Sequence, residues 1–240
     1  MSKPFQFKEF TIHQDITAMK VGTDGVLLGA WCAVDDFPNS ILDIGSGTGL
    51  IGLMLAQRTD AMTIDAVDVD EQAYEQTVQN FELSDWGDRL FCYHSSFQEF
   101  AEEMAGEGEE YDLIISNPPF YTDEFETEDA ARNKARFTSS LSFKELIEGA
   151  NQLLSKAGRF VTIIPYKEEQ AFVSLAIESN WFLTRVCRVK GTETSEIKRS
   201  LLEFSYEETE LVKEELVIEI SRHNYTEKYK ELTGDFYLKL

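Results

Sequence analysis

The sequence predicts a doubly wound α/β sheet, and three observations support this fold class. Apolar runs of strand length alternate with helix-length segments through five units. The first apolar run leads directly into a glycine-rich turn, Gly45-Ser46-Gly47-Thr48-Gly49, and then into a helical segment. The second run ends at an acidic residue, Asp68. Strands that alternate with helices pair in parallel, so functional residues are expected where these strands end.

Length and composition are those of one globular domain. The chain has 240 residues, of which 42% are hydrophobic and 12% aromatic, and this is enough to bury a sizeable core. We expect a single domain over residues 1–240. Within it, an N-terminal arm and helix occupy 1–36, the core occupies 37–206, and a C-terminal extension occupies 207–240.

The net charge of -22 is the most unusual feature of the composition. An acidic protein repels polyanions, which argues against a nucleic-acid partner unless cations gather locally. Cations do gather in two stretches, which include Arg132, Lys134 and Arg136, and then Lys190, Lys198 and Arg199. Each stretch is either an RNA contact or an ordinary solvated surface, and we predict the RNA contact.

Cysteine and histidine usage indicates neither disulfides nor a metal site. Cys32, Cys92 and Cys187 are far apart and form no Cys-x-x-Cys pair, and the three histidines are equally scattered. Such cysteine usage favours a reducing compartment. No apolar run is long enough to span a bilayer, and the N-terminus lacks the apolar segment of a signal peptide. We therefore expect a cytoplasmic protein without a metal or a membrane partner, of unknown oligomeric state.

The N-terminal segment predicts an arm, a loop and a helix. Residues 5–12 are aromatic and partly alternating, as in a short strand or a hairpin. A polar turn between Gly22 and Gly25 follows, with Thr23 or Asp24 as the N-cap of a helix over 26–32. This turn either closes over a small ligand or simply caps the helix.

The core elements then alternate along the chain. Strands are predicted over residues 40–44, 63–67, 90–94, 111–116 and 159–165, and helices over 50–58, 71–81, 143–154 and 168–179. Further strands are predicted over 181–189, 200–206 and 216–220, before a polar-aromatic tail from 225 to 240.

The glycine-rich turn has the chemistry of a nucleotide-type pocket. Glycines adopt positive φ and let a ligand approach the backbone, and the helix that follows offers free amides. A dinucleotide fingerprint would place its third glycine at position 50, where this chain has Leu50. Asp68 lies about 20 residues beyond the turn, where it can accept hydrogen bonds from both ribose hydroxyls of a nucleoside. Asp70 is expected to cap the next helix.

Two later strand ends carry further candidate residues. Ser96 and Phe97 follow the third strand, where an adenine could lie, although helix capping and core packing explain them equally well. The fourth strand is followed by Asn117-Pro118-Pro119-Phe120. Consecutive prolines end a strand abruptly because neither has an amide to donate. They leave an amide side chain, rigid carbonyls and an aromatic ring at the edge of the sheet, or they merely punctuate a loop.

Taken together, the motifs resemble a known family. The stretch 43–49, Asp68 and the Asn117-Pro118-Pro119-Phe120 motif resemble the Rossmann-type S-adenosylmethionine-dependent methyltransferases that act on exocyclic or amide nitrogen. The stretches 20–31 and 225–238 resemble, more narrowly, the bacterial tRNA (adenine-N6)-methyltransferases that modify valine tRNA beside the anticodon. Together these stretches extend over almost the whole chain.

The resemblance implies a Rossmann-like methyltransferase sheet, mostly parallel, with one antiparallel strand near the C-terminus, at 200–206. It implies S-adenosyl-L-methionine as the methyl donor. The cofactor-binding residues that it implies are Gly22, Thr23, Asp43, Gly45, Gly47, Asp68, Ser96, Phe97 and Asn117. Many relatives carry Asp or Asn in the turn that is Ser95-Ser96-Phe97 here, so the chain departs from the family pattern at the adenine contact.

The residue types indicate how Asn117, Pro118 and Phe120 would act as catalytic residues. An aromatic amine is a weak nucleophile because its lone pair is delocalised into the ring. The Asn117 side-chain oxygen and the Pro118 carbonyl can accept both amine hydrogens, and Phe120 can stack on the base. We expect methyl transfer to N6 of an adenine in tRNA, beside the anticodon of a valine tRNA. A glutamine amide in a protein, a guanine amine in ribosomal RNA, and a non-catalytic scaffold are the alternatives.

Overall fold

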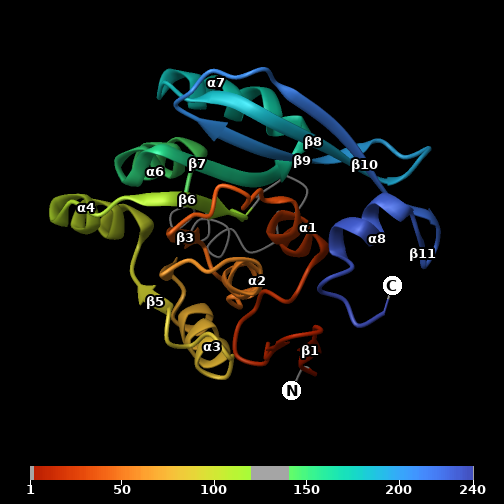
Figure 1. Ribbon diagram of the computed structural model, residues 1–240, viewed down its shortest axis with the longest axis horizontal. Helices are drawn as coiled ribbons and strands as arrows, with labels where there is room; N and C mark the ends of the chain where they lie inside the picture. The colour runs from red at the N-terminus through yellow and green to blue at the C-terminus, as the bar shows by residue number, and fades with distance from the viewer. Residues whose placement is uncertain (1–2, 120–140, 240) are drawn as a thin grey trace, which may run out of the picture.

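The computed structural model describes residues 3–119 and 141–239. In this part of the chain the central feature is a nine-stranded sheet of order β11-β10-β8-β9-β7-β6-β3-β4-β5 (Figure 1). Its strands are β3 (Ser40–Ile44), β4 (Thr63–Asp68), β5 (Leu90–His94), β6 (Tyr111–Ser116), β7 (Leu154–Pro165), β8 (Phe182–Thr192), β9 (Ile197–Ser205), β10 (Val212–Ser221) and β11 (Asn224–Tyr225). The predicted arm is a separate hairpin of β1 (Phe5–Gln6) and β2 (Thr11–Ile12).

The strand directions confirm a mostly parallel sheet with a reversed strand near the C-terminus. From β5 to β7 every neighbouring pair is parallel. The strand predicted at 200–206 is β9, which runs antiparallel to both β7 and β8. β10 is parallel to β8, and the short β11 adds a second antiparallel strand at the outer edge. The carboxyl ends of β3, β4, β6, β7, β8 and β10 therefore meet at one edge of the sheet.

Helices cover both faces of this sheet, as a doubly wound fold requires (Figure 1). The helices on one face are α1 (Thr23–Trp31), α2 (Leu50–Arg58), α3 (Glu71–Glu82) and α8 (Glu227–Thr233). Those on the other face are α4 (Phe97–Glu107), α6 (Phe143–Leu153) and α7 (Glu169–Glu178), the last preceded by the 3-10 turn η2 (Tyr166–Glu168).

Alternating side chains along the central strands fill two separate cores. On β6, Leu113 and Ile115 join the core beneath α1 and α2, whereas Ile114 joins the core beneath α4 and α6. Fully burying an aliphatic side chain contributes about 1.5–3 kcal/mol. A strand that is buried on both faces is therefore an unbroken apolar run, which is the pattern that identified β6 from the sequence.

The two ends of the described chain pack against each other. Phe7 of the arm forms an antiparallel bridge with Tyr237, and the Lys8 amide donates to the Phe236 carbonyl at 2.8 Å. This contact places the arm beside the segment that follows α8, and α8 itself packs against α1. The polar-aromatic tail predicted from residue 225 thus contains a helix, which begins where the Thr226 side chain accepts a hydrogen bond from the Tyr229 amide.

The helix boundaries confirm one predicted cap and correct another. The Asp70 side chain caps α3 by accepting a hydrogen bond from the Ala73 amide. The N-cap of α1 is Gly22, without a side-chain hydrogen bond, so the prediction of Thr23 or Asp24 as the cap is wrong. Both residues lie inside the first turn, and Asp24 is engaged in an ion pair. The division of the chain at residues 36 and 206 stays a prediction.

Candidate functional site

The glycine-rich turn joins β3 to α2 in a left-handed backbone conformation. Gly45, Gly47 and Gly49 have φ values of 78°, 59° and 73°, a region that other residues rarely adopt. A Cβ built on Gly45 or Gly47 would meet nothing within 4 Å, whereas one on Gly49 would lie 2.8 Å from the Phe81 ring. The first two glycines therefore leave an open backbone surface for a ligand, and the third is required for packing against α3.

Asp68 ends β4 beside this turn. One of its carboxylate oxygens accepts a hydrogen bond from the Gly47 amide at 2.8 Å, and the other accepts from the Asp70 amide at 2.9 Å. Burial raises the pKa of Asp68 and these two amides oppose the rise. An ionised carboxylate has about four acceptor sites, so each oxygen retains acceptor capacity for a ligand hydroxyl.

Asp43 lies beneath the turn and is fully buried. Its Oδ2 atom accepts a hydrogen bond from the Gly52 amide at 3.3 Å, whereas its Oδ1 atom has no hydrogen-bond partner. Burial raises the pKa of Asp43 to about 7, and the negative charge of Asp68 adds to the rise. A buried oxygen without a partner is costly in a folded protein, and a donor supplied by a ligand at the turn would satisfy it.

Asn117 leaves β6 next to the glycine turn. Ile44 pairs with Ser116 in the parallel register, so Gly45 and Asn117 leave adjacent strands at the same edge. Ser116 is fixed on both sides, because its hydroxyl donates to the Ile44 carbonyl and its own carbonyl accepts from Thr162, each at 2.9 Å. Asn117 is half-buried, and the buried Pro118 follows it. Phe120 lies outside the described residues.

The start of α1 lies against Asn117. A Cβ built on Gly25 would be 4.0 Å from the Asn117 amide nitrogen and 3.1 Å from the Leu50 side chain, so a larger residue at position 25 would crowd the site. Gly22 and Thr23, just before Gly25 in the chain, are exposed beside it. The structure thus brings together Gly22, Thr23, Asp43, Gly45, Gly47, Asp68 and Asn117 along one edge of the sheet.

Ser96 and Phe97 are occupied by structural contacts. The Ser96 hydroxyl caps α4, accepting from the Glu99 amide at 3.3 Å and donating to the Glu99 carboxylate at 2.7 Å. The Phe97 ring is only 5% exposed and fills the space beside Gly149 of α6. The ring is therefore packed in the core, as the capping and packing alternative predicts, and a cofactor contact of Ser96 or Phe97 stays a prediction.

Val69 is a further candidate that the sequence pattern did not distinguish. It lies between Asp68 and Asp70 and is 56% exposed. Asp68 is the carboxylate predicted to bind ribose hydroxyls, and an exposed apolar side chain directly beside it is suited to cover a flat, uncharged ring. The available signal was an apolar residue between two acids just beyond a strand end.

The cations of the β8–β9 hairpin are paired with carboxylates. Lys190 lies 3.0 Å from Glu215, and the Arg199 Nε lies 2.7 Å from Asp24. Lys198 is 68% exposed and lies 3.9 Å from Glu196. These residues are at the same sheet edge as Asn117, but the ion pairs cancel most of their positive charge. Arg132, Lys134 and Arg136 lie outside the described residues.

Metal ligands and membrane-spanning helices are absent from the described part of the chain. Over residues 3–119 and 141–239, no cluster of three or more His, Cys, Asp or Glu side chains is arranged to hold a metal ion. No helix in the same ranges has the length and apolar content needed to cross a membrane. The three cysteines all lie within these ranges and are free thiols.

Sequence comparison finds close relatives along the whole chain. Residues 27–178 match the model of the methyltransferase small domain. The chain is 59% identical to the tRNA1(Val) (adenine(37)-N6)-methyltransferase of Christiangramia forsetii, over 100% of this chain and 99% of the relative. Proteins of the same name from Bacteroides fragilis and Pseudoalteromonas translucida are 42% and 41% identical, over at least 98% of both chains.

Solved structures share the fold at lower identity. A protein described as a predicted O-methyltransferase from Agrobacterium tumefaciens aligns with a TM-score of 0.68 at 18% identity, covering 89% of this chain and 96% of its own. TYW2 of P. horikoshii in complex with MeSAdo aligns with a TM-score of 0.57 at 14% identity, covering 84% and 69%. At these identities the likeness shows the fold alone.

Proposed function

The chain belongs to the methyltransferase small-domain family and, within it, to the tRNA1(Val) (adenine(37)-N6)-methyltransferases, and on this premise we propose that it methylates N6 of an adenine in tRNA. The methyl donor is S-adenosyl-L-methionine, and the target is the adenine beside the anticodon of a valine tRNA. One structural observation carries the proposal. Ile44 and Ser116 are paired on neighbouring strands, so the open glycine turn that follows Ile44 and the Asn117 that follows Ser116 lie side by side.

The residues around the turn fit this cofactor. Gly45 and Gly47 offer an open backbone surface, and Asp68 retains acceptor capacity for two ribose hydroxyls. The unpartnered Oδ1 atom of Asp43 lies beneath the turn, and the exposed Gly22–Thr23 segment begins the helix that lies against Asn117; both are suited to the methionine portion. When bound, the cofactor supplies an electrophilic methyl group on a positively charged sulfur.

Asn117 and Pro118 would hold the adenine amine. The Asn117 side-chain oxygen and the Pro118 carbonyl accept hydrogen bonds from the two N–H groups of the amine. These bonds draw the nitrogen lone pair out of the ring. Asn117 is well placed for this because Ser116 before it and Pro118 after it are buried and rigid. Positioning of this kind supplies much of the rate enhancement in transfer reactions, and no strong base is needed. Phe120 is proposed to stack on the adenine.

The tRNA has to be held by an acidic protein. Of the predicted cations, Lys198 is the most exposed on the β8–β9 hairpin, and we propose that it contacts RNA together with Arg132, Lys134 and Arg136. Lys190 and Arg199 then act mainly through their ion pairs. The enzyme is proposed to work in the cytoplasm, where tRNA is modified and free thiols persist.

Nucleoside analysis tests the function directly. Bulk tRNA, ribosomal RNA and a heat-treated protein extract are each incubated with the enzyme and methyl-labelled S-adenosylmethionine, digested and resolved by mass spectrometry. The expected product is labelled N6-methyladenosine. Label found only in protein would indicate glutamine-amide methylation, and label in N2-methylguanosine of ribosomal RNA would indicate guanine chemistry; either result would contradict the proposal.

A further inference from the structure

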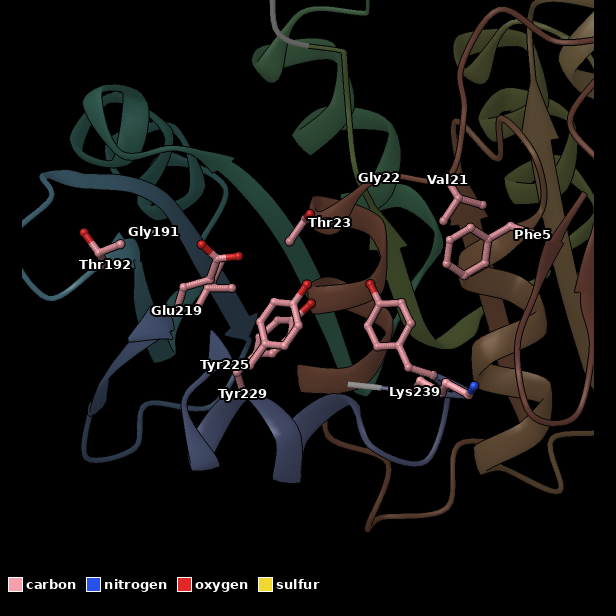
Figure 2. A pocket seen from close by; sticks show the side chains of 12 residues that line it. Phe5, Val21, Gly22, Thr23, Gly191, Thr192, Glu219, Tyr225, Tyr229 and Lys239 are labelled. Carbon is pink, nitrogen blue, oxygen red and sulfur yellow. The ribbon is translucent and has the colours of Figure 1, made fainter. Parts of the chain in front are cut away.

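A cavity of about 600 Å³ opens between the two ends of the described chain (Figure 2). Its size is within the range of small-ligand pockets. The side chains that give the cavity its chemical character include those of Phe5, Thr23, Glu219, Tyr225, Tyr229 and Tyr237. Of these six, Thr23 alone belongs to a segment that also borders the methyl-transfer site.

The cavity lies on the same edge of the sheet as Asn117. β8 and β10 run in the same direction as β6, so Thr192 and Glu219, near their carboxyl ends, face the edge to which Asn117 belongs. The first turn of α1 separates the two places. Thr23 lines the cavity, and Gly25 two residues later lies against Asn117. A polymer that reaches Asn117 along this edge from the side of β10 therefore passes the cavity.

Aromatic rings form the wall of this cavity. Tyr225 and Tyr229 are stacked, with ring centroids 5.0 Å apart and an interplanar angle of 28°. Tyr229 is only 3% exposed and supports the half-exposed Tyr225 from behind. The rings of Phe5 and Tyr237 meet edge-on at 6.1 Å. Figure 2 shows Tyr225 and Tyr229 between Glu219 on one side and Phe5 on the other.

The polar groups select for a base over a phosphate. Glu219 brings a carboxylate into the cavity, and its Oε1 accepts a hydrogen bond from the His223 amide at 3.3 Å. A carboxylate repels a phosphate but accepts hydrogen bonds from the exocyclic amine of a nucleobase. The one lysine that lines the cavity, Lys239, lies on the opposite side from Glu219 (Figure 2), where it can meet the backbone of the same nucleotide.

The overall electrostatics favour such a contact. With a net charge of -22 and with Lys190 and Arg199 already paired with carboxylates, the phosphate contacts proposed for the remaining cations supply only part of the affinity. Stacking on aromatic rings needs no net charge and tolerates any base, and it is the main alternative for binding unpaired RNA.

We propose that this pocket holds an unstacked nucleobase of the tRNA that flanks the target adenine. The inference rests on the proposed function, because the flanking base is defined by the adenine held at Asn117. Tyr225 supplies the stacking face, Tyr229 supports it, and Glu219 accepts a hydrogen bond from the base. The pocket thereby positions the anticodon loop and takes no part in the methyl transfer itself.

Steady-state kinetics on a synthetic anticodon stem-loop provide the test. Tyr225→Ala should raise the KM for the stem-loop roughly tenfold, the usual scale for losing one stacked base, with kcat and cofactor affinity unchanged. Tyr225→Phe should retain wild-type KM, and Tyr225→Leu, which keeps bulk but not stacking, should resemble the alanine variant. Phe37→Ala is the matched control, since this 86% exposed ring lies before β3 at the opposite edge of the sheet.

A double-mutant cycle identifies the base. Stem-loops with an abasic nucleotide at one position flanking the adenine are compared with the intact stem-loop. At the position whose base occupies the pocket, the abasic nucleotide should weaken binding to the wild type but should not weaken binding to Tyr225→Ala any further. The pocket assignment is wrong if the losses of affinity caused by the abasic nucleotide and by Tyr225→Ala add at every position. It is also wrong if Tyr225→Ala leaves KM unchanged while adenine is still methylated. If the wild-type protein does not methylate the adenine at all, the proposed function fails and the pocket assignment fails with it.

Discussion

Asp24 in the first turn of α1 and Arg199 on β9 form an ion pair, with the Arg199 Nε 2.7 Å from the Asp24 carboxylate, although the two residues are 175 positions apart in the sequence. Each side chain is about one-third exposed, so solvent screens the pair and its direct contribution to stability is small. Its position is more informative than its energy, because α1 carries Gly25 against Asn117 and Thr23 into the tyrosine-lined cavity. The pair therefore fixes the helix start that borders both sites.

Arg199→Ala should loosen this helix start. We expect the KM for both cofactor and RNA to rise a few-fold and amide hydrogen exchange over residues 22–25 to accelerate, because partly exposed segments open with little free energy once a tertiary contact is lost. Global stability should fall by less than about 1 kcal/mol. Lys144→Ala removes an exposed ion pair with Glu148 on the opposite face and is the control. Equal exchange rates in the two variants would contradict this role.

Asn117→Ala should lower kcat by roughly 10²- to 10³-fold, the scale for losing one oriented polar group at the reacting atoms. The KM for RNA and the dissociation constant of the cofactor should change little, because glycine-turn and Asp68 contacts persist. Single-turnover methylation and isothermal titration calorimetry measure the two effects separately. The exposed Asn39, at the amino edge of the sheet, supplies the control Asn39→Ala. Turnover within a factor of two of wild type would exclude the proposed mechanism.

Asp68 and Asp70 should separate ligand binding from helix capping. Asp68→Ala should weaken cofactor binding by about 10²- to 10⁴-fold, since two charge-assisted hydrogen bonds of about 1.5–3 kcal/mol each are at stake. Asp70→Ala removes the cap of α3 and should cost about 1 kcal/mol of stability while leaving cofactor affinity nearly unchanged. Calorimetric titration and urea unfolding of both variants check this. The assignment is reversed if Asp70→Ala loses more cofactor affinity than Asp68→Ala.

Asp43 should make the cofactor-free protein less stable as pH rises toward neutrality. Burial raises its folded-state pKa to about 7, from an ordinary aspartate value of 3.8. Between these values the folded state holds a proton that the unfolded state has released, so the free energy of unfolding falls as pH increases from about 4 to 7 and levels off above.

Asp43→Asn removes this titration and keeps an acceptor for the Gly52 amide. The variant should be more stable than wild type at pH 8, by up to roughly 4 kcal/mol, and nearly equal at pH 4, while binding the cofactor less well. Urea unfolding at the two pH values measures the difference. The exposed Asp60→Asn is the control. Parallel pH profiles for wild type and Asp43→Asn would show that the carboxyl does not titrate in this range.

Much of the fold could be predicted because its signals are local. β3, β5 and β6 have the predicted bounds. β3 and β6 are almost fully buried, and strands buried on both faces are unbroken apolar runs that end at turn residues. α8 was missed because its seven residues have too little apolar periodicity to indicate a helix, and packing against α1 and β10 provides what the sequence pattern lacks. β7 begins at Leu154, five residues before the predicted start, because no turn separates it from α6.

The site was predictable in its motifs and much less so in its electrostatics. The neighbourhood of Asp68, the glycine turn and Asn117 follows from the rule that parallel strands place their carboxyl ends together. The partners of Lys190 and Arg199 depend on strand register and on the approach of α1 to β9. No local sequence pattern encodes such contacts between distant segments. The sequence therefore predicted a stretch of cations but not the carboxylates that pair with them.

The bridge between Phe7 and Tyr237 has a consequence for how the molecule reaches its working state. The tyrosine-lined cavity combines residues 5–23 with residues 191–239, so it can form only after the intervening sheet has brought these segments together. Contacts of such long sequence separation form late in folding. The ability to bind RNA should thus appear after the methyl-donor pocket has formed, and a partly folded chain should bind S-adenosylmethionine before it can bind tRNA.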